Sequence, residues 1–254
     1  MSRTIAVANQ KGGVGKTTTT ISLGACLSDL GKKVLLVDMD PQQHVNLGLS
    51  ITPEDMGLST YDLMIDPQAN PDSSIVKCSD NLHVLPSNLD LAMAEYELMG
   101  KVASDKRLSN QLNKIEDRYD FIIIDCPPSI GLLTINSLLA SQEVIMAIDP
   151  EFLAMQGVIR LLKLLEEITG AHQKKISYYT LITRCDSRIR IAKEVCAEVR
   201  KQFGDLCLKT VINNNVKLKE AVSQGISIHE YDKSSKGYED YFNLAKEILN
   251  KKPD

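Results

Sequence analysis

A glycine-rich turn near the start of the chain constrains the fold more than any other feature. Residues 4–20 read TIAVANQKGGVGKTTTT, where a short apolar run passes into glycines and then into a threonine-rich segment. The ending Gly15-Lys16-Thr17 fits the phosphate-loop pattern of glycine, four residues and Gly-Lys-Ser/Thr. Such a loop requires a strand before it and a helix after it. The sequence therefore predicts a phosphate-binding loop between a strand and a helix.

The residue types in this loop suit a bound phosphate chain. Glycines let successive backbone N–H groups point into one concavity, and the following helix adds the positive end of its dipole. Lys16 would reach the β- and γ-phosphates, Thr17 would offer its hydroxyl to Mg²⁺, and Thr18 would bond the α-phosphate. The alternative, a glycine-rich turn with a solvated lysine, leaves the intact ending and the flanking strand unexplained. The expected nucleotide contacts are Gly12, Gly13, Val14, Gly15, Lys16, Thr17 and Thr18.

The rest of the chain alternates short apolar runs with helical patterns. Runs rich in valine and isoleucine that alternate with helices are typical of βαβ units and a parallel sheet covered on both faces. The expected strands are residues 4–9, 33–38, 81–86, 121–126, 143–148, 176–183 and 206–212. The expected helices are residues 16–30, 131–140, 153–169, 189–203, 216–224 and 237–250. We predict one α/β domain over residues 1–254, a mostly parallel twisted sheet with helices on both faces, with the proline-containing segment 50–75 as a surface excursion.

Composition and charge narrow the function classes. The chain has 254 residues, 43% of them hydrophobic and 24% charged, which is ordinary for a globular domain that needs no disulfides. Its formal charge of −4 gives no overall attraction to nucleic acid or anionic lipid, so such a partner would need a local basic patch. No two of the six cysteines stand in Cys-x-x-Cys spacing, which argues against a zinc site. The sequence has no apolar run of signal-peptide or membrane-span length, and we expect a cytoplasmic protein.

Three aspartates stand at the ends of apolar runs. Asp38 and Asp40 end VLLVDMD, and Asp125 ends FIIID, the shape of a Walker B element. Ligands of open α/β sheets bind beyond the carboxyl ends of the strands, and a carboxylate there can hold Mg²⁺ through a water. We therefore expect Thr17, Asp38 and Asp125 around the metal. For Asp38 and Asp40 the alternative is an acidic strand end that only caps the next helix.

One part of the loop departs from the ordinary phosphate-loop pattern. Gln10 stands where the first glycine should be, and a second lysine, Lys11, follows it. The run K-G-G-V-G-K-T-T resembles the deviant Walker A motif of the ParA/MinD/Soj class of ATPases. D-x-D-P-Q resembles switch I of that class, and D-C-P-P-S-I-G-L-L-T-I-N-S-L is very close to the ParA switch II consensus. TVINNNVKLKEAVSQGISIHEYD also aligns with a ParA stretch, so the resemblance runs from Ile5 to about Ile248.

The resemblance implies a P-loop NTPase of the deviant Walker type that hydrolyses ATP to ADP and phosphate with Mg²⁺. In that class the extra lysine reaches across an ATP-bound homodimer to the partner's phosphates, which gives Lys11 a role comparable to an arginine finger. On the same likeness Asp40 positions or activates the attacking water, Asp38 organises the Mg²⁺ shell or the loop, and Asn215 lies near adenine. The implied catalytic residues are Lys11, Lys16, Asp40 and Asp125.

Some positions depart from the family pattern. Asn213 and Asn214 replace a proline and an arginine. Gln43 and His44 replace the usual Gly-Asn after D-P-Q, and Gln156 replaces a common glutamate. If the missing arginine normally contacts DNA, part of that contact is absent here. None of these positions has a phosphate or Mg²⁺ role in the family.

Positive charge concentrates in residues 184–219. This stretch holds nine basic and four acidic residues, a net +5 in a chain of total −4, so the remainder carries −9. Such asymmetry favours a face for a polyanion, and ParA-type proteins bind DNA without sequence preference through this C-terminal region. An ordinary solvated helix face at 189–203 is the alternative. The candidate DNA-binding residues are Arg188, Arg190, Lys217 and Lys219.

Three rival functions use a similar nucleotide site. A MinD-like membrane positioner should end in a basic amphipathic helix, whereas the tail from Gly237 has little net basicity and suits packing on its own domain. A reductase like the nitrogenase iron protein needs two suitably placed cysteines per subunit, and Cys126 stands in a C-P-P-S run that follows the ParA pattern instead. The third rival is a scaffold that positions non-DNA cargo, and the sequence hardly distinguishes it from a protein that partitions chromosomes.

The sequence as a whole predicts a ParA/Soj-like partition ATPase. ATP would drive a monomer-to-dimer switch, the homodimer would bind DNA non-specifically, and a ParB-like activator would trigger hydrolysis. The phosphate loop begins at residue 10, which leaves no room before it for a helix-turn-helix and predicts the short type. We expect no membrane partner and a nucleoid-associated protein in the cytoplasm. The sequence does not separate a chromosome from a plasmid as cargo.

Overall fold

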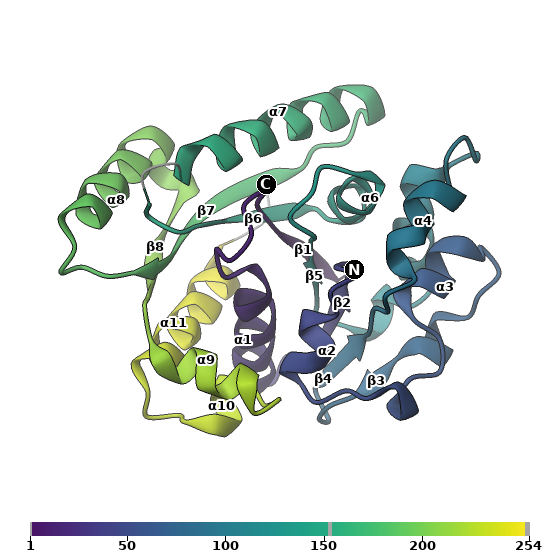
Figure 1. Cartoon of the computed structure of the whole chain (residues 1–254), viewed down its shortest axis with the longest axis horizontal. Coiled ribbons are helices and arrows are strands. Elements are labelled where there is room, and N and C mark those ends of the chain that lie inside the picture. The colour runs from purple at the N-terminus through teal and green to yellow at the C-terminus, as the bar shows by residue number, and fades with distance from the viewer. Residues whose placement is uncertain (1, 152–153, 252–254) are drawn as a thin grey trace.

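An eight-stranded sheet runs through the molecule, of which the computed structural model describes residues 2–151 and 154–251 (Figure 1). The strand order is β3-β4-β2-β5-β1-β6-β7-β8, and within the described residues every pairing is parallel except that of β3 with β4. The strands are β1 (Arg3–Ala8), β2 (Val34–Asp38), β3 (Val76–Lys77), β4 (Leu82–Leu85), β5 (Phe121–Asp125), β6 (Glu143–Ile148), β7 (Ser177–Cys185) and β8 (Cys207–Asn213). The predicted mostly parallel α/β fold is confirmed, and each of the seven expected strands is present.

Helices cover both faces of this sheet. The helices are α1 (Lys16–Asp29), α2 (His44–Gly48), α3 (Thr60–Ile65), α4 (Leu91–Glu97), α5 (Arg107–Leu112), α6 (Leu132–Ala140), α7 (Ala154–His172), α8 (Arg190–Phe203), α9 (Val216–Ser223), α10 (Ile228–Tyr231) and α11 (Lys236–Asn250). Strand side chains alternate between two cores, so Ile5 and Val7 face one core while Ala6 and Ala8 face the other. Helices α1, α2 and α9 to α11 close the first core, and α3 to α8 close the second (Figure 1).

Several short elements were not predicted from the sequence. The six expected helices correspond to α1, α6, α7, α8, α9 and α11, although the expected start at residue 153 lies outside the described residues. Helices α2 to α5, α10 and strand β3 are new. Within the segment 50–75, α3 buries Leu63 and Met64, so the interpretation of this segment as a surface excursion is wrong there. A helix of six residues is too short to show a helical period in the sequence.

The C-terminal helix is tied to the beginning of the sheet. Tyr241 and Ile248 of α11 are fully buried in the core that α1 closes. The guanidinium of Arg3 donates to the carbonyls of Ile248 and Lys251. It also pairs with the buried carboxylate of Glu143, with 2.7 Å between Nη2 and Oε2. The expectation that the tail packs on its own domain is therefore confirmed.

The Arg3–Glu143 pair gives a prediction about stability. Glu143 is 1% exposed, so Glu143→Gln would leave the Arg3 charge without its counterion in a largely buried place. We expect this change to lower the free energy of unfolding by about 3 kcal/mol, measured by urea denaturation. The double variant Arg3→Met/Glu143→Gln should lose less than Glu143→Gln alone, because it removes the unpaired charge. An equal or larger loss in the double variant would contradict this account.

Candidate active site

A cavity of about 530 Å³ opens at the carboxyl ends of the central strands. The loop between β1 and α1 lines it, together with residues from the segments 40–47, 183–184 and 212–222. The expected contacts found in its lining are Gly12, Gly13, Gly15, Lys16, Thr17 and Thr18. The side chain of Val14 is buried in the core, so Val14 can contribute only backbone groups. Pro128, after β5, and Tyr241 of α11 line it as well, so segments far apart in the sequence meet at the edge where the motifs predict a ligand.

The bend of the loop depends on glycine at two positions. Gly13 and Gly15 have φ angles of 75° and 87°, the left-handed region that other residues rarely adopt. The loop is also held from the side, because the hydroxyl of Thr183 donates to the carbonyl of Val14 at 2.7 Å. Helix α1 begins directly after Gly15, so its first N–H groups lie at the cavity. This arrangement of N–H groups and helix dipole can bind a phosphate chain.

Lys16 carries a buried positive charge into this cavity. The residue is 7% exposed, and its ammonium group donates to the carbonyl of Lys11 at 3.2 Å. Burial lowers the pKa of Lys16, and the negative charges of Asp125 and Asp40 partly offset this effect. Phosphate oxygens would supply the negative charge that this buried ammonium group needs.

Asp125 and Thr17 form the part of the site that suits Mg²⁺. Asp125 is fully buried and accepts hydrogen bonds from the hydroxyls of Thr17 at 2.6 Å and Thr20 at 3.3 Å. Burial raises the pKa of Asp125 to about 7 against the opposing effects of Thr17 and Lys16. A divalent cation would favour the ionised carboxylate. Among the described residues no group of three or more acidic, histidine or cysteine residues could hold a metal by itself.

Asp38 and Asp40 differ in what they contact. Asp38 is fully buried, and its two oxygens accept from the backbone N–H groups of Asp40 at 2.9 Å and Val45 at 3.1 Å. Burial also raises the pKa of Asp38. Asp40 is 6% exposed and lines the cavity. Of the two roles expected for Asp38, the contacts support the one in which it shapes the loop, and its metal role stays a prediction.

Lys11 lies at the rim of the site rather than inside the cavity. It is not among the residues that line the cavity in the described part of the chain. Its ammonium group pairs with the carboxylate of Glu151, in the segment that follows β6. The side chains of Lys11 and Glu151 are 38% and 59% exposed. Sequence reasoning missed Glu151, because no local pattern links residues 140 positions apart.

Three successive asparagines, the last residue of β8 and the two that follow it, also line the cavity. Asn215 caps α9 by accepting from the N–H of Lys217 at 2.8 Å, and the side chain of Asn213 donates to Asp240 at 2.9 Å. Asn214 lines the cavity beside them. The Asn213-Asn214 departure from the family pattern thus lies at the cavity and not on a distant surface. The adenine contact expected of Asn215 is compatible with this place and stays a prediction.

The four expected DNA-binding residues do not form one cluster. The side chains of Arg188 and Arg190 are 88% and 93% exposed, and they pair with Asp186 and Glu194. Lys217 pairs with Glu220 and lies 5.5 Å from the centre of the Tyr231 ring. Lys219 lines the cavity.

Arg184, which also contributes to the basic stretch, is at the cavity too. It donates to the carbonyl of Gly13 and pairs with Asp149. No sequence pattern indicates this place, because the partners of Arg184 come from other segments.

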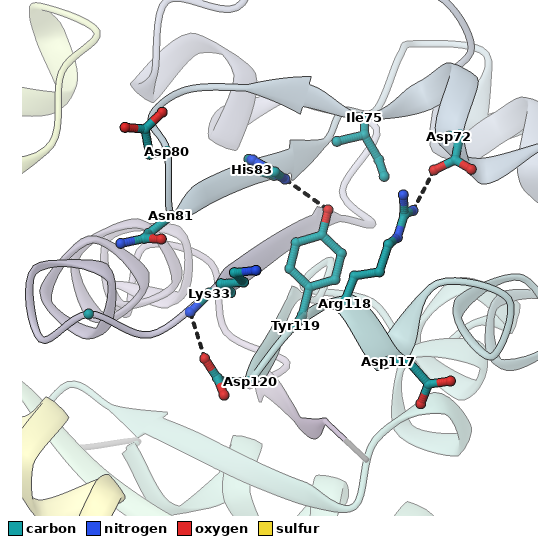
Figure 2. Close-up of a pocket in the computed structure, with 11 residues that line it drawn as sticks. Lys33, Asp72, Ile75, Asp80, Asn81, His83, Asp117, Arg118, Tyr119 and Asp120 are labelled. Carbon is teal, nitrogen blue, oxygen red and sulfur yellow. Dashed lines mark hydrogen bonds and ion pairs between the residues drawn. The ribbon is translucent and has the colours of Figure 1, made fainter.

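A second cavity, of about 800 Å³, lies at the amino ends of β2, β4 and β5. Figure 2 shows its polar groups, several of which pair with one another: His83 with Tyr119 at 2.9 Å, and Arg118 with Asp72. This cavity is larger than the first, but it lies at the edge of the sheet opposite to the glycine loop and the buried charges. We therefore place the candidate active site in the first cavity.

Comparison with known proteins agrees with the geometry. A family described as an AAA domain matches residues 2–178. The sporulation initiation inhibitor protein Soj of Bacillus subtilis is 43% identical over 98% of both chains, and the chromosome-partitioning ATPase Soj of Treponema pallidum is 39% identical over 98% of both. A solved cobyrinic acid a,c-diamide synthase of Mycobacterium smegmatis, with bound ATP analog and magnesium, is 33% identical, covers 98% of this chain and 95% of that one, and gives a TM-score of 0.85. With its phosphate loop, second lysine and buried aspartates in place, the chain belongs to the ParA/Soj family of ATPases.

Proposed function

We propose that this chain is an ATP-dependent, dimerising ATPase that binds DNA without sequence preference and partitions a chromosome or plasmid with a ParB-like activator. One relative is named a chromosome-partitioning ATPase, which supports the partition role. A structural relative holds an ATP analog with magnesium, which supports ATP and Mg²⁺ as the ligands of this site. The reaction would be hydrolysis of ATP to ADP and phosphate.

The observation that carries the proposal is the cluster of the buried Lys16 and Asp125 with the half-buried Thr17 at the glycine loop. The ammonium group would bind the β- and γ-phosphates, and the Thr17 hydroxyl and the Asp125 carboxylate would hold Mg²⁺. Bound Mg²⁺ would neutralise charge on the phosphate oxygens. Asp40 lines the same cavity and would position the attacking water.

The position of Lys11 supports a role across a dimer. Its ammonium group sits at the rim on Glu151 and outside the cavity of its own chain. A lysine at the rim can enter a second site only when that site faces it, as in a dimer with both nucleotides between the chains. Hydrolysis would then depend on dimer formation.

DNA binding rests on the exposed arginines of the basic stretch. Arg188 and Arg190 precede and begin α8, and each pairs with a carboxylate close in sequence. Exposed ion pairs of this kind are weak, so a phosphate backbone can compete for both guanidinium groups. A dimer presents two copies of this surface to one duplex, which makes the affinity for DNA depend on ATP. Such binding would place the protein on the nucleoid in the cytoplasm.

A second candidate is an ATPase that positions cargo other than DNA. The pairing of Arg188 and Arg190 with acidic neighbours and the absence of an arginine at Asn214 favour it. Membrane positioning is less favoured, because α11 buries its apolar side in the core. Among the described residues no helix is both long enough and apolar enough to cross a bilayer.

Asp40 separates nucleotide binding from turnover. We expect Asp40→Ala to bind Mg·ATP but to hydrolyse it at least tenfold more slowly, because the attacking water loses its acceptor. Phosphate release and gel filtration with ATP would measure the slower turnover and the longer-lived dimer. Asp117→Ala, a change of an exposed aspartate at the opposite edge of the sheet, is the control. Wild-type turnover by Asp40→Ala would remove the proposed role.

Lys11 should matter for the dimer and not for binding within one chain. We expect Lys11→Ala to bind ATP with nearly wild-type affinity and to remain a monomer in light scattering with Mg·ATP. Lys101→Ala, which changes an exposed lysine elsewhere, should dimerise normally. A normal ATP-dependent dimer of Lys11→Ala would exclude the trans role.

The DNA-binding part of the proposal is tested by fluorescence anisotropy with two duplexes of unrelated sequence, with ATP and with ADP. The wild-type chain should bind both duplexes alike and only with ATP. Arg188→Ala/Arg190→Ala should weaken both complexes equally and flatten the plot of log affinity against log salt by about 0.9 for each phosphate that is no longer neutralised. Arg118→Ala, at the opposite edge of the sheet, is the control. If the double variant forms the ATP dimer and binds DNA as the wild type does, the two arginines belong to a solvated helix face. That result would favour the second candidate, an ATPase that positions cargo other than DNA.

A further inference from the structure

Two residues at the carboxyl end of β7 donate hydrogen bonds to two successive carbonyl groups of the phosphate loop. Thr183 donates its hydroxyl to the carbonyl of Val14 at 2.7 Å, and Arg184 donates from Nη1 to the carbonyl of Gly13. In a trans peptide the carbonyl and the following N–H point in opposite directions. Fixing these two carbonyls toward β7 therefore directs the N–H groups of Val14 and Gly15 to the other side. Those N–H groups belong to the loop that would bind the phosphates.

Arg184 is itself held in place. Its Nη1 lies 3.2 Å from Oδ2 of Asp149, whose side chain is 9% exposed. The backbone of Arg184 has a φ of 51°, the left-handed region that residues with a side chain rarely adopt. Such conformations persist where the surroundings impose them, and they cluster at functional sites. A solvated surface arginine would need neither an almost buried carboxylate nor this backbone conformation.

The surrounding charges form one connected group at this side of the loop. Asp149 and Glu151 follow β6, and they pair with Arg184 and Lys11, respectively. Two carboxylates thus hold two cations, Lys11 within the loop and Arg184, which contacts the carbonyl of Gly13. Only Arg184 of these two cations also lines the cavity and contacts a loop carbonyl. The ammonium group of Lys11 can therefore separate from Glu151 without changing the conformation of the loop, whereas Arg184 helps to fix that conformation.

We propose that Arg184, oriented by Asp149, is a positioning residue that keeps the phosphate loop in its binding conformation and slows the release of bound nucleotide. The proposal rests on the nucleotide-binding function proposed above. It concerns the loop N–H groups, which ADP and ATP would both use, so release of both nucleotides should change together. A direct contact of Arg184 with the γ-phosphate would change the release of ATP alone.

The test is the dissociation rate of methylanthraniloyl-ADP and of the corresponding non-hydrolysable ATP analogue, measured by stopped-flow fluorescence with Mg²⁺. Arg184→Met keeps the length of the side chain and removes its charge and donors. We expect it to release both nucleotides about 10- to 100-fold faster, as for removal of a hydrogen bond from a charged group. Asp149→Asn should cause a smaller increase. The double variant should match Arg184→Met, because Asp149 acts through Arg184.

Arg118→Met is the matched control. Arg118 also pairs with an aspartate, Asp72, and its side chain is 48% exposed against 42% for Arg184, but it lies at the opposite edge of the sheet (Figure 2). It should release nucleotide at the wild-type rate. Arg184→Lys, which keeps the charge, should recover part of the slow release. Melting temperatures close to that of the wild type would show that each variant folds.

Three results would overturn the proposal. These are release from Arg184→Met within twofold of the wild type, an effect on the ATP analogue alone, and additive effects of Arg184→Met and Asp149→Asn. Lys16→Ala separates this outcome from failure of the proposed function. Binding by the wild type that disappears in Lys16→Ala keeps the nucleotide site, whatever Arg184 does. A wild-type chain that binds neither nucleotide would overturn the proposed function itself.

Discussion

Two buried carboxylates on neighbouring strands are the constraint on which the site depends. Asp38 of β2 and Asp125 of β5 are paired in register and are both fully buried. Burial raises the pKa of each, so neither charge would be tolerated there without hydrogen-bond donors. Asp125 accepts hydrogen bonds from the hydroxyls of Thr17 and Thr20 of α1. Asp38 accepts hydrogen bonds from two backbone N–H groups of the segment after β2. Because both carboxylates need hydrogen-bond donors, these contacts hold the first turn of α1 and the loop that contains Asp40 at the same edge of the sheet.

Parts of the structure could be predicted because their signal is local. The turn from β1 to α1 and the ends of β2 and β5 each carry their chemistry within about ten residues of sequence. Lys16 and Asp40 accordingly line the cavity and Asp125 ends β5, while their expected roles stay predictions. The apolar runs of the strands were found for the same reason, because each is continuous in the sequence. The short helix α3 was missed because six residues show no helical period, although Leu63 and Met64 are buried as deeply as any strand residue.

Other features could not be predicted because they depend on contacts between distant segments. The sequence shows the charge of Arg184 but not its partners, Gly13 and Asp149, which come from loops after β1 and β6. Counting charge by sequence position therefore grouped a cavity residue with the exposed Arg188. Residues 184–219 are rich in basic side chains, but the fold places some of them, such as Arg184, at the cavity and others, such as Arg188, on the surface.

Two cations at the phosphate loop, Lys11 of the loop itself and Arg184 of β7, have opposite requirements. A lysine that acts across a dimer must be held while the chain is alone and must still be easy to release. The Lys11–Glu151 pair meets both needs, because an ion pair between groups 38% and 59% exposed contributes only about 0–1 kcal/mol. In the proposed dimer, a triphosphate in a drier interface would offer Lys11 more negative charge in a lower dielectric, so it could outcompete Glu151. Arg184, bound to a nearly buried carboxylate and a backbone carbonyl, has no comparable freedom. In the proposed dimer, the side of the loop that Arg184 holds could therefore stay rigid for binding while Lys11 moved to the partner chain.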